Sequence, residues 1–155
     1  MPKYEVRKVG ARIMSLSDPT VKMSKSDPKG DIFLKDDMKT VRKKIMSAVT
    51  DTGCEVKYDP ENKPGISNLL TIYAAIKDMS IEDAEKEFVG KRYGEFKTAV
   101  ADAVVAELEP FQNRYKEIVE NKEYEQVLKE GAVKAKKLAH ETLVRVQKAV
   151  GLLSL

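Results

Sequence analysis

A short polar segment, Lys22-Met23-Ser24-Lys25-Ser26, has residue types and a spacing suited to binding a polyanion. Two lysines three residues apart bring two ammonium groups within reach of one compact anion, and the small serines add hydroxyl and open backbone N–H donors. Such donors suit the β- and γ-phosphates of a nucleotide, where negative charge builds up as pyrophosphate departs. Met23 is unbranched and could anchor the segment or lie against a flat base. A solvated basic loop without a ligand is the alternative interpretation.

Turn signals lie on both sides of this segment. Ser-Asp-Pro occurs at 17–19 and again at 26–28, and each copy favours a turn because Asp forms Asx-turns and Pro fixes φ. The segment is therefore predicted to be a loop that is held at both ends. The short apolar run 11–16 ahead of it predicts one strand. A single strand cannot satisfy its own backbone hydrogen bonds, so this strand needs a sheet that the sequence does not supply.

From Asp36 onward, apolar residues recur with the period of an α-helix. Asp36 and Asp37 indicate a helix start, and Ser80 followed by Asp83 resembles a capping box. A proline at position 110 is predicted to kink or divide a long helix, and a glycine at position 131 to break or bend another. The predicted helices cover about 36–49, 64–76, 93–119, 123–129 and 132–150, with a short one after residue 80. The predicted fold class is therefore mainly α, with one strand and a loop in front.

The composition favours a soluble, helix-rich chain of ordinary domain size. Of 155 residues, 42% are hydrophobic and 34% are charged. No apolar run approaches the roughly 20 residues that a membrane span needs, and no signal peptide is visible. Cys54 is the one cysteine of the sequence, which excludes an internal disulfide. A reducing, cytoplasmic location is the simplest expectation.

Charge is distributed unevenly along the chain. Residues 1–64 carry 14 Lys+Arg against 10 Asp+Glu, residues 65–128 carry 8 against 13, and residues 129–155 carry 6 against 2. The two basic ends would attract a polyanion such as ATP or RNA, whereas the acidic middle would repel it. Ordinary solvated helix faces explain the same distribution, so charge alone does not choose between the two interpretations.

The segment at 22–26 also matches, without substitution, the second signature of class I aminoacyl-tRNA synthetases. Its surroundings resemble the bacterial tryptophanyl-tRNA synthetases, in order and over nearly the whole chain from Val9. Tyrosyl enzymes share the architecture but usually carry an altered lysine loop, so the resemblance is to the tryptophanyl family. The segments that carry it are GARIMSLSDPT before the signature, SDP after it, and then KKIMSAVTD, KPGISNLL and LKEGAVKA.

This resemblance implies activation of tryptophan by ATP, with release of pyrophosphate, and transfer of the amino acid to tRNA(Trp). Lys22 and Lys25 would be the catalytic residues, because they would stabilise the triphosphate and the departing pyrophosphate. Mg²⁺ would accompany ATP, although no carboxylate cluster in the sequence indicates a metal site. The residues that the resemblance places around ATP are Ile13, Lys22, Met23, Ser24, Lys25 and Ser26.

Other parts of the family pattern are absent. The first class I signature, His-Ile-Gly-His or a variant, does not occur, and the single histidine, His140, lies in a helical stretch. The resemblance therefore implies the C-terminal half of an enzyme whose Rossmann-like α/β half is missing, and which is expected to be a homodimer when complete. Residues 1–35 would be the terminal strand and loop of the nucleotide-binding domain, and residues 36–155 a helical bundle of the anticodon-binding type. Alone, the chain is expected to be inactive.

Basic residues of the helical part are candidates for contact with tRNA. Lysines spaced along a helix serve equally well as a solubilising face, and none of the candidates carries a base-reading signature. A second hypothesis therefore stays open, namely a free-standing helical module that binds tRNA, another RNA or a partner protein and retains the loop by descent. The candidates are Arg114, Lys116, Lys134 and Lys137.

Overall fold

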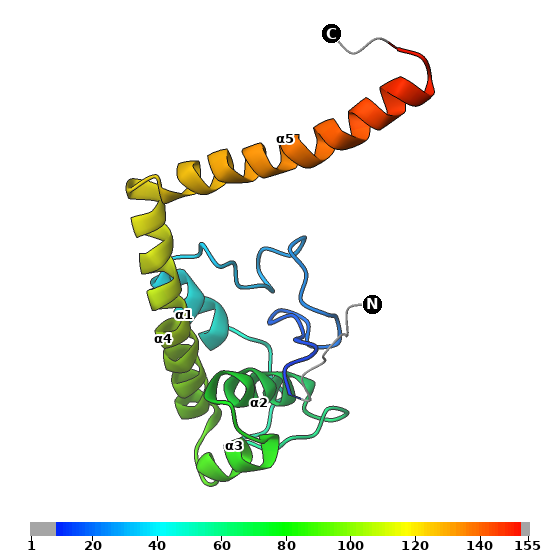
Figure 1. The fold of residues 1–155 in the computed structure, drawn as a ribbon. Coiled ribbons are helices and arrows are strands. Elements are labelled where there is room, and N and C mark those ends of the chain that lie inside the picture. Colours follow the sequence, from blue (N-terminus) through cyan, green and yellow to red (C-terminus); the bar gives the residue numbers. More distant parts are fainter. Residues whose placement is uncertain (1–8, 153–155) are drawn as a thin grey trace. The chain divides into compact units, whose positions relative to one another are not determined.

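The computed structural model describes residues 9–152, which are mainly α-helical (Figure 1). By packing, the described chain divides into two compact units, the first ending at Gln112 and the second beginning at Asn113. The boundary predicted between residues 35 and 36 is a division by function and stays a prediction. Within the described residues, no helix is both long and apolar enough to cross a membrane. The helices are α1 (Met38–Met46), α2 (Pro64–Lys77), α3 (Ile81–Glu87), α4 (Tyr93–Glu120) and α5 (Glu123–Ala149).

The first three helices begin at the local signals that the sequence carries. The carboxylate of Asp37 caps α1 by accepting a hydrogen bond from the Thr40 N–H at 2.9 Å. Helix α2 begins at Pro64, whose fixed φ suits the first helical position. The Ser80 hydroxyl caps α3 by accepting from the Asp83 N–H at 3.1 Å. The predicted helix starts are therefore confirmed.

The first unit is built around a hydrophobic core to which α1, α2, α3 and the first half of α4 each contribute an apolar face. Phe88, which caps the end of α3, lies edge-on between Tyr73 and Phe96, with ring centroids 5.0 Å and 4.7 Å away. These apolar faces follow the helical period of the sequence, so the mainly α fold class is confirmed. Residues with no exposed surface include Val41, Ile45, Ile66, Leu69, Leu70, Phe96 and Val100.

Residues 11–16 do not form the strand that the sequence predicts. Within residues 9–152 they make only an isolated antiparallel bridge between Met14 and Lys22. Two backbone hydrogen bonds of 2.8 Å and 3.0 Å flank this bridge, and the pairing ends there because residues 24–27 form a turn. Leu16 is 3% exposed and belongs to the core of the first unit. Residues 11–16 are therefore packed against the helices of the first unit, and they do not form a separate element.

Neither of the two long helices is divided at the proline or the glycine where the sequence predicts a kink or division and a break or bend. Helix α4 continues through Pro110, because a proline removes one helical hydrogen bond while the bonds of the turns before and after it persist. Helix α5 continues through Gly131, so the predicted break there is wrong. Glycine keeps its N–H and C=O groups and weakens a helix by about 1 kcal/mol relative to alanine without interrupting its hydrogen bonds.

Candidate functional site

Residues 22–26, the signature segment, turn their polar side chains to solvent and their methionine inward. Lys22 and Lys25 are exposed, as are the two serines of the segment. Met23 is half-buried, packs against the core of the first unit and lines an apolar pocket of about 270 Å³. Ile13 lines the same pocket. Of the two roles predicted for Met23, the structure therefore shows the anchor.

The loop that carries the signature segment is closed at its base by Asp27. The carboxylate of Asp27 accepts hydrogen bonds from the hydroxyls of Ser17 at 2.7 Å and Ser15 at 3.2 Å. The bond from Ser17 is the main reason why the pKa of Asp27 lies below its usual value. Next to it, the Leu16 N–H donates to the Gly30 C=O at 2.7 Å. The two Ser-Asp-Pro copies thus meet, since Ser17 belongs to the first and Asp27 to the second.

The segment before the loop is held from its other side by α2. The Met14 N–H donates to Asn68 Oδ1 at 2.8 Å, and Asn68 Nδ2 donates to the Met14 C=O at 2.8 Å. Asn68 is 5% exposed. Sequence reasoning missed both Asn68 and Asp27. The available signal for Asn68 was a polar residue inside the apolar run that opens the predicted second helix.

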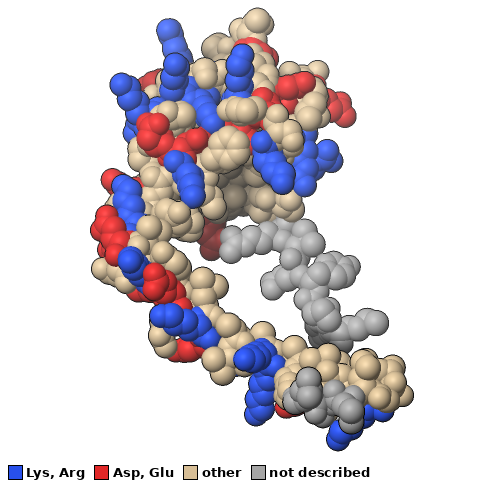
Figure 2. Space-filling model, turned by 90° about the horizontal axis from the view of Figure 1, so that it is seen from above, with Lys and Arg blue, Asp and Glu red and all other residues tan. Residues whose placement is uncertain are grey.

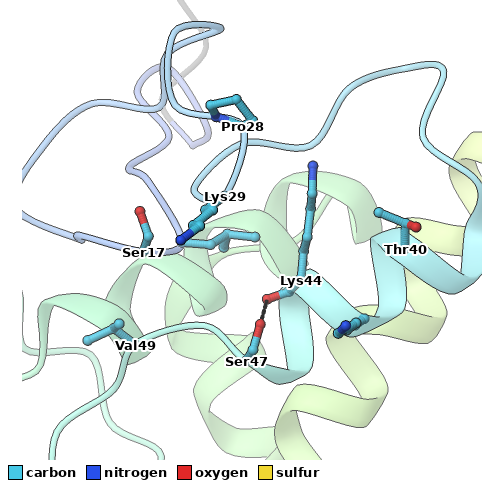
Figure 3. A pocket seen from close by; sticks show the side chains of 9 residues that line it. Ser17, Pro28, Lys29, Thr40, Lys44, Ser47 and Val49 are labelled. Atoms are coloured by element: carbon cyan, nitrogen blue, oxygen red, sulfur yellow. Dashed lines mark hydrogen bonds between the residues drawn. The ribbon is translucent and has the colours of Figure 1, made fainter.

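A second pocket, of about 530 Å³ and open to solvent, lies beside the base of the loop (Figure 3). Lys29 of the loop and Lys43 and Lys44 of α1 line it. The Lys44 ammonium is already bound to Asp36 at 2.7 Å, and the Ser47 hydroxyl donates to the Lys44 C=O at 3.1 Å. Within residues 9–152 neither Lys29 nor Lys43 has an ion-pair partner. The pocket therefore adds positive charge near the signature segment, but its lysines do not surround one enclosed anion site.

The six residues predicted to surround ATP lie in the paired segments 13–14 and 22–26. Four of them, Lys22, Lys25 and the two serines, present exposed polar groups on one loop. The other two are apolar and line the pocket beneath that loop. This arrangement can hold an anionic group on its polar side, because two ammonium groups and two hydroxyls are available there. The roles of the six residues in ATP binding stay a prediction.

In the second unit, Arg114 binds acidic residues on both sides of the turn between α4 and α5. Its guanidinium lies 2.6 Å from Glu123 and 3.1 Å from Glu117, and its hydrogen bonds lower the pKa of Glu123. Because its charge is paired, Arg114 is less available to a phosphate than a free lysine. On the face drawn in Figure 2, Lys and Arg side chains are interspersed with Asp and Glu rather than gathered in one patch. The other tRNA candidates, exposed and without an ion pair in the described chain, are Lys116, Lys134 and Lys137.

The described residues do not fit a magnesium site built by the protein. No group of three or more His, Cys, Asp or Glu side chains that could hold a metal ion lies within residues 9–152. Mg²⁺ prefers oxygen ligands, usually one or two carboxylates together with phosphates, whereas the signature segment offers ammonium groups.

Known proteins are similar to this chain over nearly its whole length. The tryptophan–tRNA ligase of Halalkalibacterium halodurans is 52% identical, and that of Bacillus subtilis is 51% identical, over 154 residues. These matches cover 98% of this chain and 47% of each relative. The chain thus spans about half the length of the curated relatives that it matches.

Solved structures agree with these similarities. The tryptophanyl-tRNA synthetase of Mycoplasma pneumoniae superposes with a TM-score of 0.72 at 32% identity, covering 96% of this chain and 46% of that one. The enzyme of Campylobacter jejuni, complexed with ADP and tryptophan, gives a TM-score of 0.72 at 29% identity with the same coverage.

The family model of class I tRNA synthetases (W and Y) matches residues 3–109, which include the signature segment and α1 to most of α4. The chain belongs to the class I tRNA synthetases of the tryptophan and tyrosine type.

Proposed function

We propose that this chain is the C-terminal part of a tryptophan–tRNA ligase, which activates tryptophan with ATP and transfers it to tRNA(Trp). Relatives of that name at 52% and 51% identity support this function. The ADP bound by the Campylobacter jejuni neighbour supports the use of ATP. Because the chain spans 47% of the length of these relatives, we propose that catalysis needs the remaining Rossmann-like part, and that this chain is inactive alone.

The observation that carries the proposal is the exposure of Lys22 and Lys25 on a loop that is tied at its base and anchored by Met23. An anchored loop can hold its ammonium groups where negative charge develops as pyrophosphate leaves, without reorganising during the reaction. In this proposal the two lysines stabilise the β- and γ-phosphates, and Ser24 and Ser26 donate to them. Ile13, one of the two apolar residues beneath the loop, contacts the adenine, and Met23 anchors the loop around ATP.

The helical part contributes the surface for tRNA(Trp), through Lys116, Lys134 and Lys137 and, to the extent that its ion pairs open, Arg114. The complete enzyme is proposed to be a cytoplasmic homodimer. Mg²⁺ is proposed to arrive with ATP and to be held by the phosphates, since the described residues provide no cluster of ligands for it.

The test is tryptophan-dependent exchange of pyrophosphate into ATP by the complete enzyme that carries this sequence. Lys22→Ala and Lys25→Ala should each lower kcat about 10²- to 10³-fold, the usual cost of removing one preorganised donor. Lys39→Ala is the matched control, because Lys39 is an exposed lysine on α1 outside the signature segment. Near-normal exchange in both loop variants would reject the roles proposed for the two lysines.

One observation meets a requirement of the second hypothesis, a free-standing RNA-binding module, without favouring it over the first. Most backbone groups of residues 13–16 find hydrogen-bond partners within the chain, in residues 21–30, Val49 and Asn68. The discriminating measurement is titration of the 155-residue chain with tRNA(Trp) and with an anticodon-altered copy at two salt concentrations. Binding that depends on the anticodon would support the module, whereas weak binding that is lost with added salt would indicate charge alone.

A further inference from the structure

Asn68 binds the backbone of Met14, the residue that lies opposite Lys22. Its side chain accepts from the Met14 N–H and donates to the Met14 C=O, both at 2.8 Å. In a β-sheet, a residue of the neighbouring strand would make this pair of bonds. Here one buried side chain makes them instead. With 5% of its surface exposed, Asn68 is shielded from water, which would otherwise compete for these bonds.

The type of pairing between Met14 and Lys22 makes this contact possible. In the bridge, the hydrogen bonds of 2.8 Å and 3.0 Å are made by the residues on either side of the pair. The N–H and C=O groups of Met14 itself therefore point to the opposite edge, away from Lys22. Asn68 lies at that edge. Any shift of residues 13–15 along the chain direction would break its two bonds.

The same face of α2 also lines the pocket beneath the signature segment. Ile72 and Ile76 line the same apolar pocket as Met23. Asn68, Ile72 and Ile76 are spaced four residues apart, so they share one face of the helix. The arm before the loop is thus fixed to this helix by hydrogen bonds. Met23, on the arm that carries the lysines, packs against the hydrophobic core and lines the same pocket as Ile72 and Ile76.

We propose that Asn68 is a positioning residue that sets the register of the two paired arms and thereby the direction of the Lys22 side chain. Successive side chains of an extended segment point to opposite faces, so a slip of one residue would turn Lys22 away from the phosphates. Asn68 does not touch the nucleotide in this proposal; it acts through Met14. The inference rests on the proposed function, because the catalytic role of Lys22 is part of that function.

Two variants and one matched control test the proposal. Asn68→Ala removes both bonds to Met14. Asn68→Asp keeps an acceptor for the Met14 N–H but cannot donate to the Met14 C=O, and it provides a second variant should the first fold poorly. Ser67→Ala is the control, because Ser67 is equally buried, at 4% exposed, and accepts from the Asp59 N–H at 2.8 Å, in a different loop.

In pyrophosphate exchange by the complete enzyme, Asn68→Ala should lower kcat about 10- to 100-fold, the scale expected for a misplaced catalytic group. The KM for tryptophan should change less than about twofold, because the lysine is proposed to act on the phosphates as pyrophosphate leaves. Ser67→Ala should leave kcat near the wild-type value. In a Lys22→Ala background, Asn68→Ala should lower kcat no further, since the group that it positions is gone. An equal loss of kcat in both backgrounds, or none in either, would overturn the proposal.

Amide hydrogen exchange of the 155-residue chain gives a readout that does not depend on catalysis. The amides of Ser15 and Met23, which form the bonds flanking the bridge, should exchange at least about tenfold faster in Asn68→Ala than in Ser67→Ala. Unchanged protection would overturn the register role of Asn68. Absence of pyrophosphate exchange in the wild-type complete enzyme would reject the proposed function instead, and the amide protection would then decide the register role by itself.

Discussion

The phenolic hydroxyl of Tyr93, at the start of α4, lies 2.8 Å and 3.0 Å from the two carboxylate oxygens of Asp51. Lys63, which precedes α2, donates to the same hydroxyl at 3.1 Å and lies 3.8 Å from Asp51. Three partly buried polar groups thus connect the turn-rich segment before α2 to α4. Burial alone would raise the pKa of Asp51, but hydrogen bonds from Tyr93 and Gly53 and the charge of Lys63 outweigh it and lower that pKa.

Tyr93→Phe should destabilise the first unit by about 1–3 kcal/mol, because it removes the hydroxyl that donates to the Asp51 carboxylate and accepts from Lys63. Asp51 keeps the bond from the Gly53 N–H, and Lys63 keeps its bond to the Glu55 C=O. Urea unfolding at pH 7 measures this difference. Tyr58→Phe is the matched control, since Tyr58 lies between Asp51 and Lys63 in the same segment but is 39% exposed. Equal stability of the two variants would show that the bond between Tyr93 and Asp51 contributes nothing.

The same cluster predicts a dependence of stability on pH. The pKa of Asp51 is lower in the folded chain than in the unfolded one, so its ionisation stabilises the fold. That contribution is fully present above the unfolded pKa, about 4, and is lost as pH falls through the lower, folded value. Stability measured from pH 6 to pH 2 should therefore decrease more steeply in the wild type than in Tyr93→Phe. Parallel curves would contradict the prediction.

Gly30→Ala should disrupt the base of the loop that carries the signature segment. A Cβ at Gly30 would collide with the hydroxyls of Ser15 and Ser17 and with the carboxylate of Asp27. These groups bind one another, so separating them should cost about 1–3 kcal/mol and increase proteolytic cleavage in residues 17–30. At Gly94, no atom lies within 4 Å of an added Cβ. Gly94→Ala is therefore the control, and it should neither lower stability nor increase cleavage in residues 17–30.

Features set by neighbouring residues could be predicted from the sequence, whereas features set by distant residues could not. The caps at Asp37 and Ser80 are formed with residues three positions ahead, and both were predicted. Asn68 binds a residue 54 positions away, and in sequence it is only a polar residue in an apolar helix. Residues 11–16 were predicted as a strand but form a single bridge. Asn68 occupies one edge of this segment, and the turn at 24–27 ends the pairing on the other.

The same distinction between local and distant contacts holds for the candidate site. The signature segment was found because its five residues are contiguous, and its anchoring by Met23 was one of two predicted roles. The meeting of Ser17 with Asp27 requires the loop to close on itself, and the spacing of the two Ser-Asp-Pro copies gives no distance between them. The break predicted at Gly131 was wrong because helix propensity is a weak preference and one glycine in a helix of 27 residues does not outweigh it.

Gly131→Ala should stabilise α5 locally by about 0.5–1 kcal/mol. No atom lies within 4 Å of a Cβ at this position, and the helix runs through it, so alanine restores helix propensity without a collision. Amide exchange within α5 measures the effect, and exchange near Gly131 should become slower by a factor of about 2 to 5. Faster exchange would show that the chain needs a glycine at this position, as a break in the helix would require.

Lysines of the second unit should control the salt dependence of tRNA binding if they contact phosphates. Lys134→Ala combined with Lys137→Ala should weaken binding of tRNA(Trp) and lower the slope of log Kd against log salt by roughly 0.7–0.9 for each lost phosphate contact. Arg114→Ala should change the slope less, because Glu117 and Glu123 already pair its charge. Lys86→Ala, which removes a lysine paired with Asp83 on α3, is the control. A slope that is the same in all four proteins would place the tRNA surface elsewhere on the complete enzyme.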